Sequence, residues 1–337
     1  LRQNGYATAH FGKWHLSNNM IPDSPLPSEY GFDTYGAFNC AGEQMPVHED
    51  ARHASAFIEN SHGAGKPFFI NLWLHEPHTP FHTVPKYRWR FRDLQERDNI
   101  YASVLSHADD RIGEVLDTLD RLELTDNTLV IFGSDNGPAR AARPTELTLM
   151  HDTATGAGYG IGAARGVTGG RKGYKAALFE GGINVPFIAR WPGKIAAGEV
   201  DRRLMISAVD LLPTFCEIAG AALPPSYQPD GMSQLAQLLD PTSEGRSKPL
   251  FWKFSAVGST PAMRDGKWKL VRNFTGASSA TPGYDPPGKR GNWELYDMEK
   301  DRTELKDLAA SEPERVKNMI EQYEAWADRC GVKDREK

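Results

Sequence analysis

The sequence predicts an α/β fold: a mostly parallel sheet sandwiched by helices, followed by a small antiparallel sheet and a terminal helix. Three observations support this. Short apolar runs bounded by Gly or Pro recur through the first two thirds, a long amphipathic pattern lies between two of them, and turn-rich segments begin near Gly220. Strands separated by helical stretches need crossover connections, which favour parallel pairing.

The composition is that of an ordinary folded protein of 337 residues, enough for one large domain or a large and a small one. Lys and Arg number 39 against 44 Asp and Glu, and no basic run stands out, so we expect no nucleic-acid partner. No apolar run is long enough for a membrane span. Cys40, Cys216 and Cys330 lack metal-type spacing, and Cys216 lies in an apolar segment typical of a buried thiol.

The first expected strand is residues 6–11, which Gly12 ends. Lys13 and His15 follow almost at once. A Gly beside a Lys and a His at a strand end lets an anion approach the backbone next to a cation and an acid/base group. A surface turn that carries one Lys and one His fits the same short pattern.

The second expected strand is the apolar run KPFFINLWLH, residues 66–75, which suits a strand covered on both faces. It leads into the loop LHEPHTPF, which carries His75 and His78. Two histidines and a Glu suggest zinc, but this spacing in a Pro-broken loop is not the helical spacing of zinc metalloproteases. Histidines in such a loop are also often only solvated.

A long helix is expected next, and after it a short buried strand at residues 129–132. The strand leads into FGSDNG, where Asp135 and Asn136 stand at its carboxyl end, the place where α/β sheets bind ligands. A carboxylate beside a carboxamide suits Ca²⁺ or Mg²⁺ better than zinc, although Asp-Asn-Gly is also an ordinary turn. The helix is indicated by apolar residues at three- and four-residue steps: Ile100, Val104, Ala108, Ile112, Val115 and Leu119.

A third buried strand is expected at residues 185–191, after a Gly-rich loop that begins at Gly169. The loop carries Arg171, Lys172 and Lys175. A basic cluster on a Gly-rich loop can bind an oxyanion, although basic loop residues are more often only solvated.

Past Gly220 the segments PPSYQPDG and SEGRSKP are connectors. Asp265-Gly266 between two strand-like runs predicts a two-residue hairpin, and NWELYDM predicts another strand. Residues 311–329 form an amphipathic helical pattern with Pro313 at its start. We therefore expect a main domain at residues 1–222 and a smaller C-terminal subdomain at 223–337.

The string GYATAHFGKWHL resembles the second signature of the type I sulfatases, a family of the alkaline phosphatase superfamily. The segment GGRKGYKAALFEGGINVPFIARWPG is a second specific match, and WELYDMEKDRTELKDLA is similar to the family's C-terminal subdomain. The resemblance runs along the whole chain. It implies an alkaline phosphatase-like core and a sulfuric ester hydrolase that acts on an aryl or carbohydrate sulfate.

The resemblance also implies which residues meet the sulfate. The histidine of the family's His-x-Pro loop corresponds to His78, with His75 as a weaker candidate. The family's second sulfate-binding lysine lies five residues before the Glu of EGG, and counting back from Glu180 gives Lys175, with Lys172 as the next choice.

The implied roles divide between binding and proton transfer. Lys13 and Lys175 hold the sulfate, and one of them or His78 protonates the leaving group. His15 supports the hydroxyl of a formylglycine, the aldehyde residue of sulfatases, and helps to release sulfate. The implied substrate is a sulfated small molecule or glycan.

Asp135 and Asn136 resemble the family's third metal-binding element and are expected to bind one divalent cation, Ca²⁺ first and Mg²⁺ second. Formylglycine forms from Cys or Ser in Cys/Ser-x-Pro-x-Arg, and neither Cys40 nor Cys216 begins that pattern. We therefore expect formylglycine, and the aspartates that complete the metal site, in an N-terminal segment that this chain lacks. Without that segment the chain is expected to be inactive.

By the same resemblance, a formylglycine-generating enzyme is an expected partner of the intact protein, and export to a periplasmic, extracellular or lysosomal compartment is expected. One alternative is a phosphodiesterase or phosphonate hydrolase of the same superfamily. Its two-metal members usually carry Asp-His where this chain has Asp135-Asn136. The other alternative is a non-catalytic binder of sulfated glycans, which would follow if the complete gene lacked the formylglycine pattern.

Overall fold

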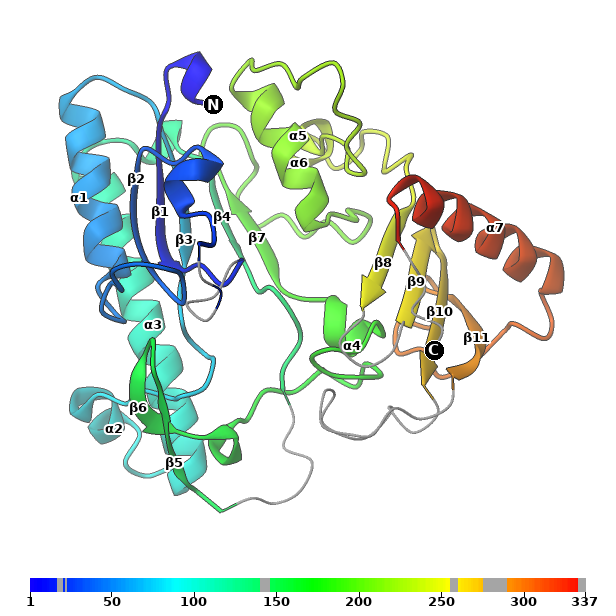
Figure 1. Cartoon of the computed structure of the whole chain (residues 1–337), viewed down its shortest axis with the longest axis horizontal. Coiled ribbons are helices and arrows are strands. Elements are labelled where there is room, and N and C mark those ends of the chain that lie inside the picture. The colour runs from blue at the N-terminus through cyan, green and yellow to red at the C-terminus, as the bar shows by residue number, and fades with distance from the viewer. Residues whose placement is uncertain (17–20, 22, 140–145, 255–259, 275–289, 333–337) are drawn as a thin grey trace.

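The computed structural model describes residues 1–16, 21, 23–139, 146–254, 260–274 and 290–332 (Figure 1). It has an α/β architecture, with a three-stranded parallel sheet near the N-terminus and a four-stranded antiparallel sheet near the C-terminus. This confirms the predicted fold class. Among the described residues, no helix is both long and apolar enough to cross a membrane.

The N-terminal part of the chain alternates strands and helices, and the C-terminal part is a β-meander followed by one helix. In chain order they are β1 (Ala7–Lys13), β2 (Thr34–Phe38), α1 (Asp50–Gly63), β3 (Phe68–Trp73), α2 (Pro85–Arg90), α3 (Glu96–Arg121), β4 (Val130–Gly133), β5 (Leu149–Asp152), β6 (Gly156–Tyr159), α4 (Glu180–Ile183), β7 (Phe187–Arg190), α5 (Ala208–Ile218), α6 (Leu235–Leu239), β8 (Leu250–Phe254), β9 (Thr260–Asp265), β10 (Trp268–Phe274), β11 (Arg290–Asp297) and α7 (Pro313–Arg329).

The parallel sheet has the order β2-β1-β3. Gly12 does not end β1, as the sequence suggested; it lies inside the strand, opposite Ala37 and Trp73. Its φ of +102° and the close approach of β3 explain the residue type, because a Cβ here would meet the Trp73 carbonyl oxygen at 2.1 Å. The strand therefore continues to Lys13 and carries it to the carboxyl edge of the sheet.

The predicted strands at residues 129–132 and 185–191 form β4 and β7, but these two pair antiparallel in a separate two-stranded sheet. They are also less buried than expected, with Phe132 46% and Ile188 59% exposed. The expectation of a parallel neighbour was therefore wrong for β7. Its apolar run indicated a strand, but the direction of pairing depends on the path of the Gly-rich connection.

Helix α3 confirms the periodicity at residues 100–119, and it runs beside α1, which packs on β1 and β3 (Figure 1). Ile100, Val104 and Leu119 are buried, as the apolar stripe predicts. These helices cover the side of the parallel sheet that lies away from the C-terminal subdomain (Figure 1).

The C-terminal sheet has the order β11-β10-β9-β8 and is covered on both faces. Alternate residues sort to the two faces, as the two-residue period of a strand requires. One face packs on α7 through Met263, Leu270, Leu295, Met319 and Tyr323. The other packs on the segment before α4 through Ala177, Leu178, Phe179, Ala262, Val271 and Tyr296.

Local details of the C-terminal part agree with the sequence within about a residue. In the hairpin between β9 and β10, Asp265 pairs with Trp268, so the two turn residues are Gly266 and Lys267 rather than Asp265 and Gly266. Helix α7 begins at Pro313, and Cys216 is buried. The division between residues 222 and 223 remains a prediction.

A buried lysine joins the C-terminal sheet to the Gly-rich loop. The Nζ of Lys269, on β10, lies 2.8 Å from Glu180 Oε1 and 2.8 Å from Glu304 Oε1, and the Lys269 side chain is fully buried. Glu304 also accepts a hydrogen bond from the backbone N–H of Glu180 at 2.6 Å. Burial raises the pKa of Glu180, but Lys269, Asn184 and Arg264 together outweigh that effect and the net shift is downward.

We predict that Lys269→Ala lowers the free energy of unfolding by about 3–5 kcal/mol, because it leaves two buried carboxylates without their cation. Urea unfolding of the full-length protein, followed by tryptophan fluorescence, measures the change. Lys306→Ala is the control, since Lys306 is exposed two residues from Glu304, and it is expected to change stability by less than about 0.5 kcal/mol. Equal midpoints for the two variants would contradict the role given to Lys269.

Candidate active site

Lys13 and His15 lie at the carboxyl edge of the parallel sheet. Lys13 is the last residue of β1 and is half-buried, while His15 is exposed at a φ of +44°. The backbone N–H groups of Trp14 and His15 donate to Phe38 and Asn39 carbonyl oxygens at 2.9 and 3.2 Å. These bonds hold the turn that presents the two predicted side chains beside the end of β2.

The loop after β3 brings His75 and His78 to the same edge. His78 N–H donates to the His75 carbonyl at 2.9 Å, and the bonds before Pro77 and Pro80 are cis. His75 is buried with its Nε2 3.0 Å from the Pro80 carbonyl, whereas His78 is half-buried. The side chain of His78 is thus the more accessible of the two.

Two backbone hydrogen bonds join the Asp135–Asn136 turn to the Gly-rich loop. Gly137 N–H donates to the Gly182 carbonyl at 2.8 Å, and Lys175 N–H donates to the Pro138 carbonyl at 3.0 Å. The backbones meet so closely that a Cβ on Gly137 would lie 1.9 Å from the Gly181 carbonyl oxygen. The glycines therefore set the position of Lys175 relative to Asp135.

Lys172, the alternative to Lys175, is engaged elsewhere. Its Nζ donates to Glu294 Oε2 at 2.7 Å and to Tyr296 Oη at 3.0 Å, and it lies 4.0 Å from the centre of the Phe179 ring. These contacts turn Lys172 toward the C-terminal sheet, where it is half-buried. This arrangement favours Lys175 as the lysine of the site.

The charges of five predicted residues act on one another. The pKa of Lys13 is lowered by burial and by Lys175, against the opposing effect of Asp135. Burial, then Lys13, lowers the pKa of His78, and burial, then Lys13 and Lys175, lowers that of His15. Residues from β1, from the loops after β3 and β4, and from the Gly-rich loop are therefore within electrostatic range of one another.

Asp152 also interacts electrostatically with Lys13 and His15, and the sequence analysis did not identify it as a site residue. It ends β5 at the tip of the β5–β6 hairpin, where its carboxylate accepts the backbone N–H groups of Ala154 and Thr155 at 2.9 Å. Its charge opposes the downward pKa shifts of both Lys13 and His15. The only sequence signal was an Asp in a turn, which says nothing of where the hairpin packs.

The donor set of the Asp135–Asn136 turn fits a hard divalent cation. Asp135 is exposed, and the Nδ2 of Asn136 donates to the Gly137 carbonyl at 2.9 Å, which leaves its Oδ1 as an acceptor. A carboxylate and a carboxamide oxygen are ligands that Ca²⁺ and Mg²⁺ prefer. The chain thus offers two oxygen ligands next to the two lysines.

One stretch, residues 311–315, reads SEPER and does fit Ser-x-Pro-x-Arg, a match that the expectation of a missing formylglycine pattern overlooked. Pro313 is the first residue of α7, and Ser311 Oγ donates to the Leu308 carbonyl at 2.9 Å. Pro is common at the first position of a helix. This match is therefore explained as the start of α7, which packs on the C-terminal sheet.

Comparison with known proteins gives a family for the chain. The family model described as Sulfatase matches residues 1–221, and the model described as N-sulphoglucosamine sulphohydrolase, C-terminal, matches residues 172–326. The first match alone spans more than half of the chain.

Individual relatives agree. Arylsulfatase G of Rattus norvegicus is 26% identical over 370 residues, which cover 93% of this chain and 66% of that protein. N-acetylgalactosamine-6-sulfatase of Mus musculus is 28% identical over 291 residues, which cover 75% of this chain and 50% of that protein. The chain therefore spans about half to two thirds of the length of these relatives. Among solved structures, the PsFucS1 sulfatase from Pseudoalteromonas sp. superposes with a TM-score of 0.73 at 21% identity, covering 99% of this chain and 73% of that one.

We predict that Gly137→Ala lowers the free energy of unfolding by about 1–3 kcal/mol, because the added methyl must push the two loop backbones apart. Denaturant unfolding measures the change. Gly113→Ala is the control: Gly113 lies within α3 with open space around its Cβ position, and this change is expected to stabilise by up to about 1 kcal/mol. An unchanged midpoint for Gly137→Ala would show that the loops are not in contact.

Proposed function

The chain belongs to the sulfatase family, and on that basis we propose that the full-length protein hydrolyses a sulfate ester of a carbohydrate or an aryl alcohol. One observation carries the proposal: Lys13 at the end of β1 and Lys175, whose backbone N–H binds the turn after Asp135, are far apart in the sequence, yet after burial both contribute to the lowered pKa of His78. Two cations within electrostatic range of one half-buried histidine suit a sulfate group, whose oxygens gain negative charge as the ester bond breaks.

In the proposed reaction Lys13 and Lys175 bind the sulfate oxygens and His78 faces the sulfate from the opposite loop. A proton must reach the leaving oxygen, and a group with a lowered pKa releases its proton more readily. Burial and the charge of Lys175 lower the pKa of Lys13 in this way. We therefore propose Lys13 as the first candidate for the proton donor and His78 as the second.

The cation and the nucleophile complete the proposal. Asp135 and Asn136 would hold one Ca²⁺ or Mg²⁺, which supplies positive charge next to the reacting sulfate. A formylglycine, formed by a formylglycine-generating enzyme, would supply the nucleophile, and His15 would lie beside its hydroxyl. Export from the cytoplasm is part of the same proposal.

The substrate class rests on the relatives. The family model that matches residues 172–326 bears the name of an N-sulphoglucosamine sulphohydrolase, and a relative bears the name of an N-acetylgalactosamine-6-sulfatase. Both names describe amino sugars that carry sulfate, which favours a sulfated carbohydrate. The oxygen-only donor pair of Asp135 and Asn136 gives no support to a two-metal phosphodiesterase.

We predict that Lys13→Ala and Lys175→Ala each lower kcat/KM of the full-length protein by about 100-fold or more, because each removes a fixed charge from the transferring group. Hydrolysis of 4-nitrophenyl sulfate and of sulfated amino sugars measures the loss. Lys172→Ala is the matched comparison: it is expected to lower stability through Glu294 and Tyr296 while kcat/KM changes little. A damaging Lys172→Ala with a mild Lys175→Ala would contradict the assignment of the loop.

We predict that Asp135→Ala abolishes Ca²⁺ binding, since it removes the charged ligand, and that Asn136→Ala weakens it less. Isothermal titration of Ca²⁺ into the chelator-treated full-length protein measures both. Asp126→Ala, which removes an exposed carboxylate before β4, serves as the control and should leave the affinity unchanged. Unchanged Ca²⁺ binding by Asp135→Ala would place the cation elsewhere.

A further inference from the structure

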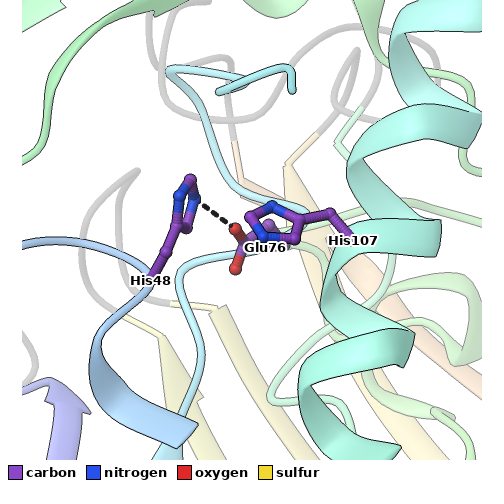
Figure 2. Close-up of side chains that lie close together, drawn as sticks. All are labelled: His48, Glu76 and His107. Carbon is purple, nitrogen blue, oxygen red and sulfur yellow. Dashed lines mark ion pairs between the residues drawn. The ribbon is translucent and has the colours of Figure 1, made fainter. Parts of the chain in front are cut away.

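Three side chains outside the proposed sulfate site converge from separate elements. Figure 2 shows His48, Glu76 and His107 pointing toward one another. His48 precedes α1, Glu76 lies on the loop after β3, and His107 is on α3. One nitrogen or oxygen atom from each lies within 4.8 Å of the others.

Two of the converging atoms form an ion pair, and a buried nitrogen of the third side chain has no hydrogen-bond partner among the described residues. The Glu76 side chain is fully buried, and its Oε1 forms an ion pair with His48 Nε2 at 2.7 Å (Figure 2). His107 Nδ1 is buried without a hydrogen-bond partner. A buried polar atom without a partner costs free energy, so His107 Nδ1, unpaired beside the His48–Glu76 ion pair, indicates an absent ligand.

The charge around the cluster favours a cation. Glu76 and Asp50 are two fully buried carboxylates, and Arg111 lies between them, 2.5 Å from Glu76 Oε2 and 2.9 Å from Asp50 Oδ1. Arg111 occupies one oxygen of Glu76, and the other faces the imidazoles.

We propose that His48, Glu76 and His107 bind one transition-metal ion of the Zn²⁺ type, separate from the hard cation proposed at Asp135 and Asn136. Two imidazoles and one carboxylate are a donor set that Zn²⁺ accepts, whereas Ca²⁺ takes oxygen ligands. A further imidazole lies nearby: the ring centre of His82 is 5.6 Å from that of His48, and its Nε2 is buried without a hydrogen-bond partner among the described residues.

The bound ion would be structural. Glu76 lies two residues before His78, so a metal shared with His107 ties the loop that carries His78 to helix α3. His48 adds the segment that precedes α1. The site is partly open to solvent through His48, whose side chain is 23% exposed, which gives the ion a path of entry.

The test is Zn²⁺ titration of the chelator-treated full-length protein by calorimetry, with excess Ca²⁺ present to fill the hard-cation site. Wild type is expected to bind one Zn²⁺. His107→Ala is expected to weaken binding by about 100-fold or more, because the loss of an outer partner of a metal ligand already costs about 10–100-fold. Co²⁺ in place of Zn²⁺ should give a visible absorption band in wild type that His107→Ala lacks.

His48→Asn provides a second variant that is expected to fold, because Asn tolerates the positive φ of 79° at this position. His62→Ala is the matched control, since His62 is exposed at the end of α1, and it should bind Zn²⁺ like wild type. Equal Zn²⁺ affinity in wild type, His107→Ala and His48→Asn would overturn the proposal. Asp135→Ala is expected to keep Zn²⁺ while losing Ca²⁺, so this result is independent of the proposed sulfatase activity.

Discussion

The position of the Gly-rich loop depends on the buried ammonium group of Lys269. Two carboxylates of different origin meet it, Glu180 at the start of α4 and Glu304 after β11. Apolar contact alone between residues 177–179 and the C-terminal sheet would tolerate sliding, because hydrophobic packing is not directional. A buried ion pair restricts position more strongly: if the charges move apart, their attraction weakens and no water is present to solvate them. The C-terminal sheet therefore supports the loop that carries Lys175, a residue of the proposed sulfate site.

Close glycine contacts fix the Asp135–Asn136 turn relative to the Gly-rich loop. Gly181 and Gly182 follow Glu180 directly, and they lie against the backbone of Gly137 and of the segment before α4, with no room for a Cβ. Lys175 is tied to the same turn through its own N–H. Lys175 and Asp135 are thus related by short backbone paths rather than by flexible side chains. Such fixed geometry is what allows charges to act on a reacting group without reorganising.

Local sequence patterns predicted the features that depend on interactions between residues close together in the chain. The period of α3, the β9–β10 hairpin and the start of α7 all rest on neighbours in the chain. The pairing of β7, the continuation of β1 through Gly12 and the place of Asp152 depend on contacts between distant segments, so no local pattern could indicate them. The roles of Lys13 and Lys175 came from resemblance, and the contacts of Lys172 supply the physical reason for choosing between two lysines in one loop.

The loop after β3 joins the proposed zinc site to the proposed sulfate site. Its Glu76 pairs with Arg111 of α3 and with His48, and the pKa of its His78 is lowered in part by Lys13 and Lys175. Because these residues are only two apart, a shift of Glu76 must move the backbone that carries His78. The two proposed cation sites use different donor sets: oxygen atoms alone at Asp135 and Asn136, and two imidazoles with one carboxylate at His48, His107 and Glu76. Each site can therefore select its own ion. The Zn²⁺-type ion would order the loop after β3, and a separate Ca²⁺ or Mg²⁺ would act on the sulfate.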